Sequence, residues 1–127
     1  MVKTALVSTD LEQGREALDA LDRAGINVNV AWWAYLPEYE DWRLVLSSRK
    51  FDNVGRSDAY GMLHNSLNAA GIPIQKQPVS LILPMSDSTI KSLRKVFGKA
   101  ASVDGMRLGG QVFGHRFIED AFVYRIT

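Results

Sequence analysis

The sequence predicts one α+β domain over residues 1–127, in which an antiparallel sheet of about five strands is covered by three amphipathic helices. Apolar residues recur at helical spacing in three stretches, they alternate in several others, and short turns separate neighbouring strands. The expected order is helix, hairpin, helix, strand, helix, hairpin, with the helices packed as one layer on the sheet. At 127 residues, 46% of them hydrophobic, the chain is long enough to bury a core without a disulfide or metal and has no room for a second domain.

The first helix is predicted from a stripe of residues spaced alternately four and three apart: Val7, Leu11, Gly14, Leu18 and Leu21. Ser8 or Thr9 is expected to cap its start, and Gly25 to end it. A short strand over residues 3–8 is the alternative for its beginning.

The first hairpin follows from an alternating, aromatic segment over residues 27–35. Pro37 and the acidic residues around it break the pattern, and residues 42–46 resume it. Residues 50–57 are interpreted as a polar loop.

The remaining helices are predicted by core stripes that end in Ala70 and Ala100, with Ser57 capping the second helix and Ser86 or Ser88 the third. Residues 24–28 and 70–74 share a Gly stop followed by Ile, so both helices are expected to end in the same way. A buried strand is predicted over residues 79–83, and a closing hairpin over residues 106–113 and 117–126. Within that hairpin, Gly109 and Gly110 indicate a bulge or a close backbone approach.

Composition excludes several classes of function. With no cysteine, the chain has no disulfide, thiol nucleophile or Cys-ligated metal. Its 15 basic and 14 acidic residues give a net charge of +1, which argues against a dedicated nucleic-acid or membrane-surface protein. No stretch has the length of a signal peptide core or a membrane span, so we expect a cytoplasmic protein, with no metal or organic cofactor and no membrane partner.

The segments LDALDRAG (residues 18–25), WRLV (residues 42–45) and FIEDAFVYR (residues 117–125) resemble those of a group of short uncharacterised bacterial proteins, which implies no activity. Residues 31–48 are similar in rhythm to the opening hairpin of GAF sensor domains, where an apolar strand, a Pro-containing acidic turn and a Leu-Val strand follow a helix. That resemblance implies a pocket for a small ligand.

Two histidines are the candidates for acid-base chemistry, because only this side chain titrates near neutrality without help. His64 lies in the second predicted helix, and His115 in the last turn. A two-histidine nuclease would need them close together, and the simpler interpretation is an exposed helix residue and a turn residue.

Glu119 and Asp120 interrupt an apolar terminal strand, and because consecutive strand residues point to opposite faces, at least one carboxylate is expected to face the covered side or the sheet rim. A buried carboxylate needs a partner, so we expect Glu119 to form a structural ion pair with Arg43 or Arg125. The first hairpin carries five large aromatic residues within eleven positions. Alternation places some on each face, so Trp33, Tyr35 and Tyr39 are candidates for an interface or a ligand site, with cover by this chain's own helices as the alternative.

The third predicted helix is basic, with Lys91, Arg94, Lys95 and Lys99 on neighbouring faces as candidate phosphate-binding residues. A solvated face is the simpler interpretation. Residues 1–40 carry three basic and seven acidic residues, whereas residues 81–127 carry seven basic and four acidic ones. Opposite charges at the two ends also suit self-association, with the acidic first helix of one copy near the basic helix of another.

The sequence therefore favours a binding or assembly module that acts through protein–protein contacts, as a homodimer or with another protein, over an enzyme. A nucleic-acid or nucleotide-binding or processing protein, using the basic helix with His64 or His115, is the alternative. A GAF-like sensor of a small ligand is a further one.

Overall fold

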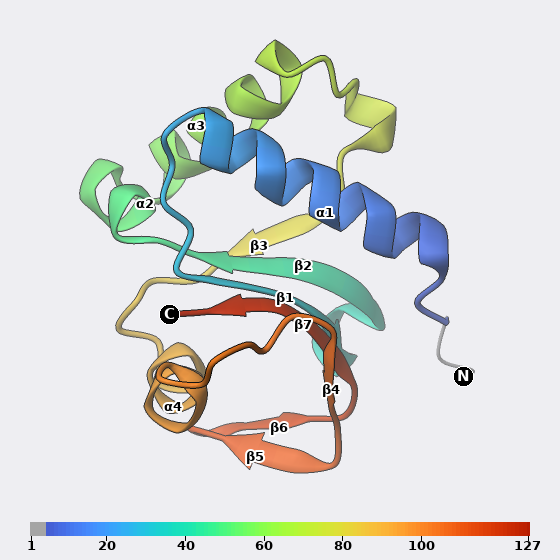
Figure 1. Cartoon of the computed structure of the whole chain (residues 1–127), viewed down its shortest axis with the longest axis vertical. Helices are drawn as coiled ribbons and strands as arrows, with labels where there is room; N and C mark the ends of the chain where they lie inside the picture. The colour runs from blue at the N-terminus through green and yellow to red at the C-terminus, as the bar shows by residue number, and fades with distance from the viewer. Residues whose placement is uncertain (1–4) are drawn as a thin grey trace.

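The computed structural model describes residues 5–127 and confirms the α+β class (Figure 1). The described part contains the helices α1 (Ser8–Arg23), α2 (Arg49–Val54), α3 (Arg56–Ala69) and α4 (Ser88–Phe97), and the 3-10 turns η1 (Pro37–Tyr39) and η2 (Ile74–Lys76). The strands are β1 (Val30–Leu36), β2 (Asp41–Ser47), β3 (Ser80–Ile82), β4 (Met106–Leu108), β5 (Gln111–Phe113), β6 (Arg116–Ile118) and β7 (Ala121–Ile126). Residues 5–7 precede the first helix without regular structure, and residues 3 and 4 of the alternative early strand lie outside the described residues.

Five strands form the main sheet, in the order β3-β2-β1-β7-β4, and β5 and β6 form a separate two-stranded sheet. β1 pairs antiparallel with β2 and with β7, so Val30 lies opposite both Ser47 and Ile126. β3 runs parallel to β2, because the chain crosses through α2 and α3 between them. The sheet is therefore mixed, and the prediction of a purely antiparallel sheet was wrong in this one strand.

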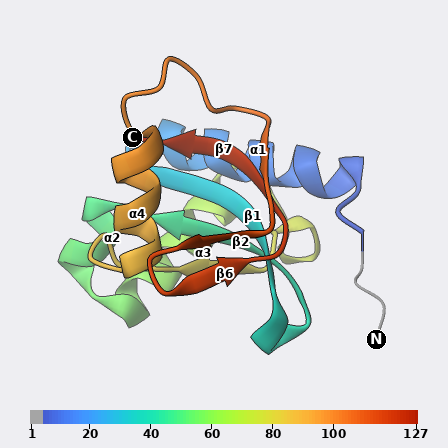
Figure 2. The same cartoon turned by 90° about the horizontal axis from the view of Figure 1, so that it is seen from below.

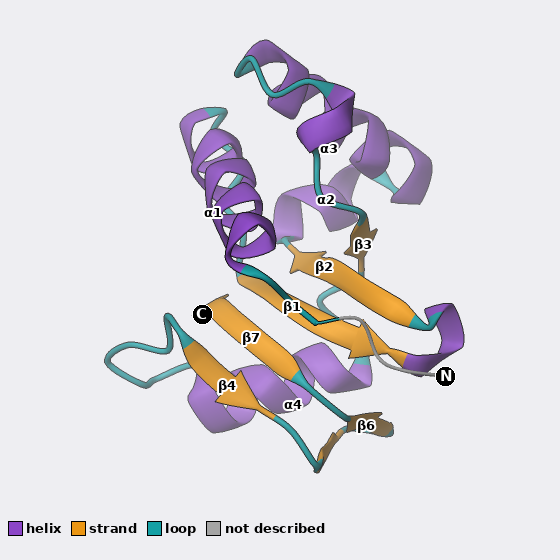
Figure 3. Ribbon diagram, turned by 90° about the vertical axis from the view of Figure 1, so that its right-hand side faces the viewer, coloured by secondary structure: helices purple, strands orange, loops and turns teal. Residues whose placement is uncertain are grey.

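The sheet is covered on both faces rather than on one, which corrects the two-layer prediction (Figure 3). α1 and α3 lie on one face, and α4 with the β5–β6 hairpin lies on the other. The reason is visible in β1, whose seven residues are all buried. Trp33 faces the core under α1 and α3, whereas Trp32 faces the core over α4. A strand that is apolar at every position needs a cover on each side.

The two glycine stops were predicted correctly. Gly25 and Gly71 have φ angles of 79° and 81°, a backbone region that glycine enters without strain. The amide of Ile26 donates to the carbonyl of Leu21, and that of Ile72 to Leu67, so α1 and α3 end in the same Schellman arrangement.

The helix starts were predicted less well. The amide of Val7 donates to the Asp10 carboxylate at the start of α1, and Gly55 rather than Ser57 precedes α3. Asp87 caps α4 by accepting from the amides of Thr89 and Ile90. Residues 50–54, the first part of the predicted loop over residues 50–57, instead belong to the short helix α2, which buries Phe51.

The closing hairpin is divided into two parts. Its base, β4 and β7, belongs to the main sheet, and its tip, β5 and β6, forms the small sheet beside α4 (Figure 2). The division falls at Gly109, where a Cβ atom would lie 2.9 Å from the Glu119 carbonyl oxygen, and at Gly110, whose φ is 68°. The predicted close backbone approach is therefore present.

Candidate functional site

The two histidines lie on opposite faces of the sheet and do not form one site. His64 is on α3, with Nδ1 2.9 Å from Oε1 of Gln77. Gln77 Nε2 donates to Asn68 and to the Ile72 carbonyl, so its oxygen faces the histidine and Nδ1 carries the proton. This network fastens the segment before β3 to α3. His115 is exposed in the turn between β5 and β6.

The expected ion pair at Glu119 is not formed, because both arginines bind other acids. Arg43 lies 3.8 Å from Asp41, and Arg125 binds Asp22. Glu119 is exposed, so it needs no buried partner. Its neighbour Asp120 is the partly buried carboxylate of this strand end, and it accepts from Arg107 at 2.8 Å.

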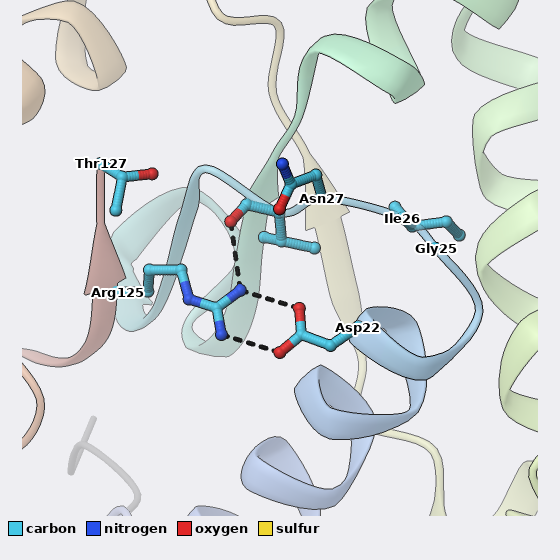
Figure 4. Close-up of a pocket in the computed structure, with 7 residues that line it drawn as sticks. Asp22, Gly25, Ile26, Asn27, Arg125 and Thr127 are labelled. Atoms are coloured by element: carbon cyan, nitrogen blue, oxygen red, sulfur yellow. Dashed lines mark hydrogen bonds and ion pairs between the residues drawn. The ribbon is translucent and has the colours of Figure 1, made fainter.

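The pair of Asp22 and Arg125 closes a hollow of about 480 Å³ between the end of α1 and β7 (Figure 4). Both guanidinium NH groups reach the carboxylate, at 2.8 and 2.9 Å, and one also reaches the Val28 carbonyl oxygen at 3.3 Å. Hydrogen bonding from Arg125 lowers the pKa of Asp22. Asp22 already neutralises the Arg125 guanidinium, so we interpret this ion pair as a structural link between α1 and β7, and not as a binding site for an anion. We name the pair the clasp.

The aromatic first hairpin is not an exposed surface. Trp33 and Tyr35 are 5% and 9% exposed, because α1 and α3 cover this face of the sheet. Tyr39 alone of the three candidates is exposed; it lies in η1 with the Arg43 guanidinium 4.7 Å from its ring centroid. At Trp33 and Tyr35 the structure therefore shows the alternative, cover by this chain's own helices.

The basic helix keeps three of its four predicted cations exposed. Lys91, Lys95 and Lys99 are exposed, with the first two one turn apart on α4 and the third just beyond its end. Arg94 instead donates from Nε to the Thr127 carbonyl at 2.8 Å, so it holds β7 against α4. A continuous stripe of three lysines remains available to a partner.

Beside α4, the β5–β6 hairpin exposes two large apolar side chains. Val112 and Phe117 lie opposite each other across the two strands and are 65% and 54% exposed. Their neighbours Phe113 and Ile118 point the other way, into the core over α4. Val96, 60% exposed, is seven residues after Thr89, whose hydroxyl donates to the Phe113 carbonyl, so it lies on the hairpin flank of α4. We name these three apolar residues and the three lysines the basic face.

The opposite side of the molecule carries a hollow of about 350 Å³ between α1 and β7. Leu11, Phe122 and Tyr124 supply its apolar wall, and Arg15 lies over the Tyr124 ring while it binds Asp104. Glu12 and Glu16 also line it, and with Asp19 they form an exposed acidic stripe along α1. We name this site the acidic hollow. In Figure 3 no helix covers the β4 end of the sheet on this side.

The floor of the acidic hollow is fixed by a buried hydrogen-bond chain. Trp33 Nε1 donates to the Tyr124 hydroxyl at 3.0 Å, and that hydroxyl donates to the Leu11 carbonyl at 2.6 Å. Burial raises the pKa of Tyr124 to about 12, so the hydroxyl keeps its proton near neutrality. Gly14 makes room for the chain, since a Cβ there would lie 2.4 Å from the hydroxyl oxygen.

Sequence reasoning missed Val112 and Phe117, although a signal was present. Each is followed by another large apolar residue, Phe113 or Ile118, and consecutive strand residues point to opposite faces. One residue of each pair must therefore leave the core unless both faces are covered. The acidic hollow had no signal in the sequence, because it depends on how α1 crosses β7.

No family model matches the chain, and neither the curated proteins nor the solved structures contain a significant match. Within residues 5–127, no group of three or more histidine and carboxylate side chains is arranged to hold a metal ion. No helix in the same range is long and apolar enough to cross a membrane.

Proposed function

We propose that the chain is a protein-binding and assembly module that self-associates through its basic face. The observation that carries this proposal is the exposed cross-strand pair of Val112 and Phe117 on a hairpin whose other side packs into the core. Single exposed apolar residues are ordinary, but two large ones side by side are typical of surfaces that a partner covers. Phenylalanine is also enriched at protein interfaces.

The lysines of the basic face determine which surface fits there. Lys91, Lys95 and Lys99 are exposed in and just beyond α4, the helix beside the hairpin, and among residues 5–127 none of them forms an ion pair. Complementary charge speeds encounter and selects the partner, while apolar burial supplies most of the affinity. An acidic surface with an apolar centre is therefore the expected partner.

Light scattering over micromolar concentrations tests self-association. We expect the wild-type mass to rise above 14.1 kDa with concentration, and the double variant Val112→Thr/Phe117→Thr to stay monomeric. Threonine keeps the strand propensity while it removes apolar surface. Val79→Thr is the matched control, because Val79 is 60% exposed at the far edge of the main sheet. A wild-type protein of 14.1 kDa at every concentration contradicts the proposal.

Nucleic-acid binding remains the second candidate, because the exposed lysine stripe is also what a phosphate backbone needs. With Arg94 engaged by Thr127, three cations are left to contact phosphates. We expect weak binding of oligonucleotides at low salt, with a log–log salt slope of at most about three, and none near physiological ionic strength. Submicromolar binding at physiological salt that Lys91→Glu/Lys95→Glu abolishes would favour this candidate over self-assembly.

A further inference from the structure

We infer that the acidic hollow between α1 and β7 receives the basic face of a second copy, so that copies join head to tail in an open chain. This inference rests on the proposed self-association. It adds the surface on which the basic face docks and the symmetry of the contact.

The two surfaces match in charge. Glu12, Glu16 and Asp19 repeat at intervals of four and three along α1, and Lys91, Lys95 and Lys99 at intervals of four in and beyond α4. Both stripes are exposed and have nearly the same length, so antiparallel or parallel docking places each lysine near a carboxylate.

The two surfaces also match in shape and polarity. The basic face projects the side chains of Val112 and Phe117 from the small hairpin. The acidic hollow is a concave site of about 350 Å³ with an apolar wall, and its residues Leu11 and Phe122 are only partly buried by the part of the chain that the structure describes. Its floor is rigid, because the Tyr124 hydroxyl is held by Trp33 and by the Leu11 carbonyl. A preformed hollow loses little conformational entropy when an apolar side chain enters it.

Their placement determines the symmetry. α1 and α4 pack on opposite faces of the sheet, as Figure 1 shows. A two-fold contact through the basic face alone would press lysines against lysines, which is unfavourable. Contact between the basic face and the acidic hollow is therefore heterologous, and a heterologous contact between opposite faces propagates instead of closing at two copies.

Strand addition at the sheet edges is a poor alternative route. The edge strands β3 and β4 have three residues each, and the outward amide of Ile82 in β3 already donates to the Tyr60 hydroxyl. Short edges of this kind resist pairing with another chain.

A charge-swap experiment tests the inference. One variant carries Lys91→Glu and Lys95→Glu, and the other Glu12→Lys and Glu16→Lys; glutamate and lysine form helix equally well, so both variants retain the fold. Each alone has two surfaces of like charge and is expected to remain monomeric by sedimentation velocity. An equimolar mixture is expected to associate again, because each surface then meets its opposite. The matched control for the α1 variant, Glu38→Lys/Asp58→Lys, makes the same change in net charge as Glu12→Lys/Glu16→Lys at exposed sites outside both surfaces and is expected to associate like the wild type.

The outcomes separate this inference from the proposed function. A wild-type protein that never associates overturns both. Association that the α4 variant abolishes and the α1 variant leaves unchanged supports self-assembly through the basic face but overturns the acidic hollow as its receptor. Failure of the mixture to associate, or a mass that reaches a plateau at a dimer, also overturns head-to-tail docking. Circular dichroism of each variant identifies any loss of association that comes from unfolding.

Discussion

The two hairpins of this protein use aromatic and apolar residues in opposite ways. The β1–β2 hairpin has the denser set, and its Trp32, Trp33, Tyr35 and Trp42 are all buried. The β5–β6 hairpin is shorter and less aromatic, yet it exposes Val112 and Phe117. The difference lies in the cover, since the first hairpin has a packed layer on each face and the second has one only on its inner face.

The comparison shows that aromatic density by itself does not identify an interface. Trp32 and Trp33 are consecutive and point to opposite faces, and each enters a separate core. A central strand between two layers absorbs every apolar residue it carries. The β5–β6 hairpin is packed on one face only, so the apolar residues of its other face stay exposed.

Replacing one large side chain in each hairpin is expected to give the largest difference in the free energy of unfolding. Trp33→Ala should lower the free energy of unfolding by about 3–5 kcal/mol, because it leaves a cavity and removes the donor to Tyr124. Phe117→Ala should change it by about 0.5 kcal/mol or less, because the side chain is already 54% exposed. Urea denaturation at concentrations where the protein is monomeric measures both. Equal losses would show that the second hairpin is as enclosed as the first.

Gly14→Ala tests how tightly the covered face is packed. The new methyl group would lie 2.4 Å from the Tyr124 hydroxyl and 2.7 Å from Trp33 Nε1, so α1 must shift away from the sheet. We expect a loss of about 1–3 kcal/mol in the free energy of unfolding. The same substitution should cost less in a Tyr124→Phe background, which removes the oxygen. If the two costs are equal, the clash with the hydroxyl is not the cause.

Breaking the clasp between Asp22 and Arg125 is expected to lower the free energy of unfolding by a smaller amount, and that amount depends on pH. The carboxylate and the arginine are 36% and 30% exposed, so Asp22→Asn should cost at most about 1 kcal/mol at pH 7. Because the folded-state pKa of Asp22 is lowered, this stabilisation is present above the unfolded pKa and is lost as pH falls through the folded value. Thermal unfolding from pH 7 down to about pH 2 should show the two proteins converging in acid. A constant difference across that range would assign the effect to something other than ionisation.

Glu119→Gln is expected to have the smallest effect, within about 0.5 kcal/mol, because the side chain is exposed and the two arginines proposed for it bind other acids. Asp120→Asn serves as the contrasting variant, since Asp120 binds Arg107. A fall of many degrees in the melting temperature of Glu119→Gln would show that Glu119 has a partner after all.

The sequence predicted local structure well where a glycine stop or a repeating apolar pattern specifies it. The two glycine stops, the alternation of the first hairpin and the helical stripes correspond to α1, β1 and α3. It missed α2, because one buried residue, Phe51, in a six-residue helix leaves no periodic pattern.

Features that depend on distant elements were not accessible. The parallel β3, the cover on both faces and the pairing of Arg125 with Asp22 all follow from how segments far apart in the chain meet. Of the candidate site, the exposed lysines were predicted and the acidic hollow was not. The residue type alone predicts that a lysine is solvated, whereas a hollow between α1 and β7 can be predicted only when the relative positions of those two elements are known.

The position of β7 next to β1 has a consequence for how the protein folds. Residue 30 pairs with residue 126, so the centre of the sheet is closed by a contact between segments that lie far apart along the chain. Such closure costs chain entropy before any packing energy is gained, and it slows folding relative to helical proteins of similar length. Both cores need this contact, because Val123 belongs to one and Tyr124 to the other. Neither layer is therefore expected to persist as a folding intermediate, and stopped-flow refolding should show no burst-phase amplitude.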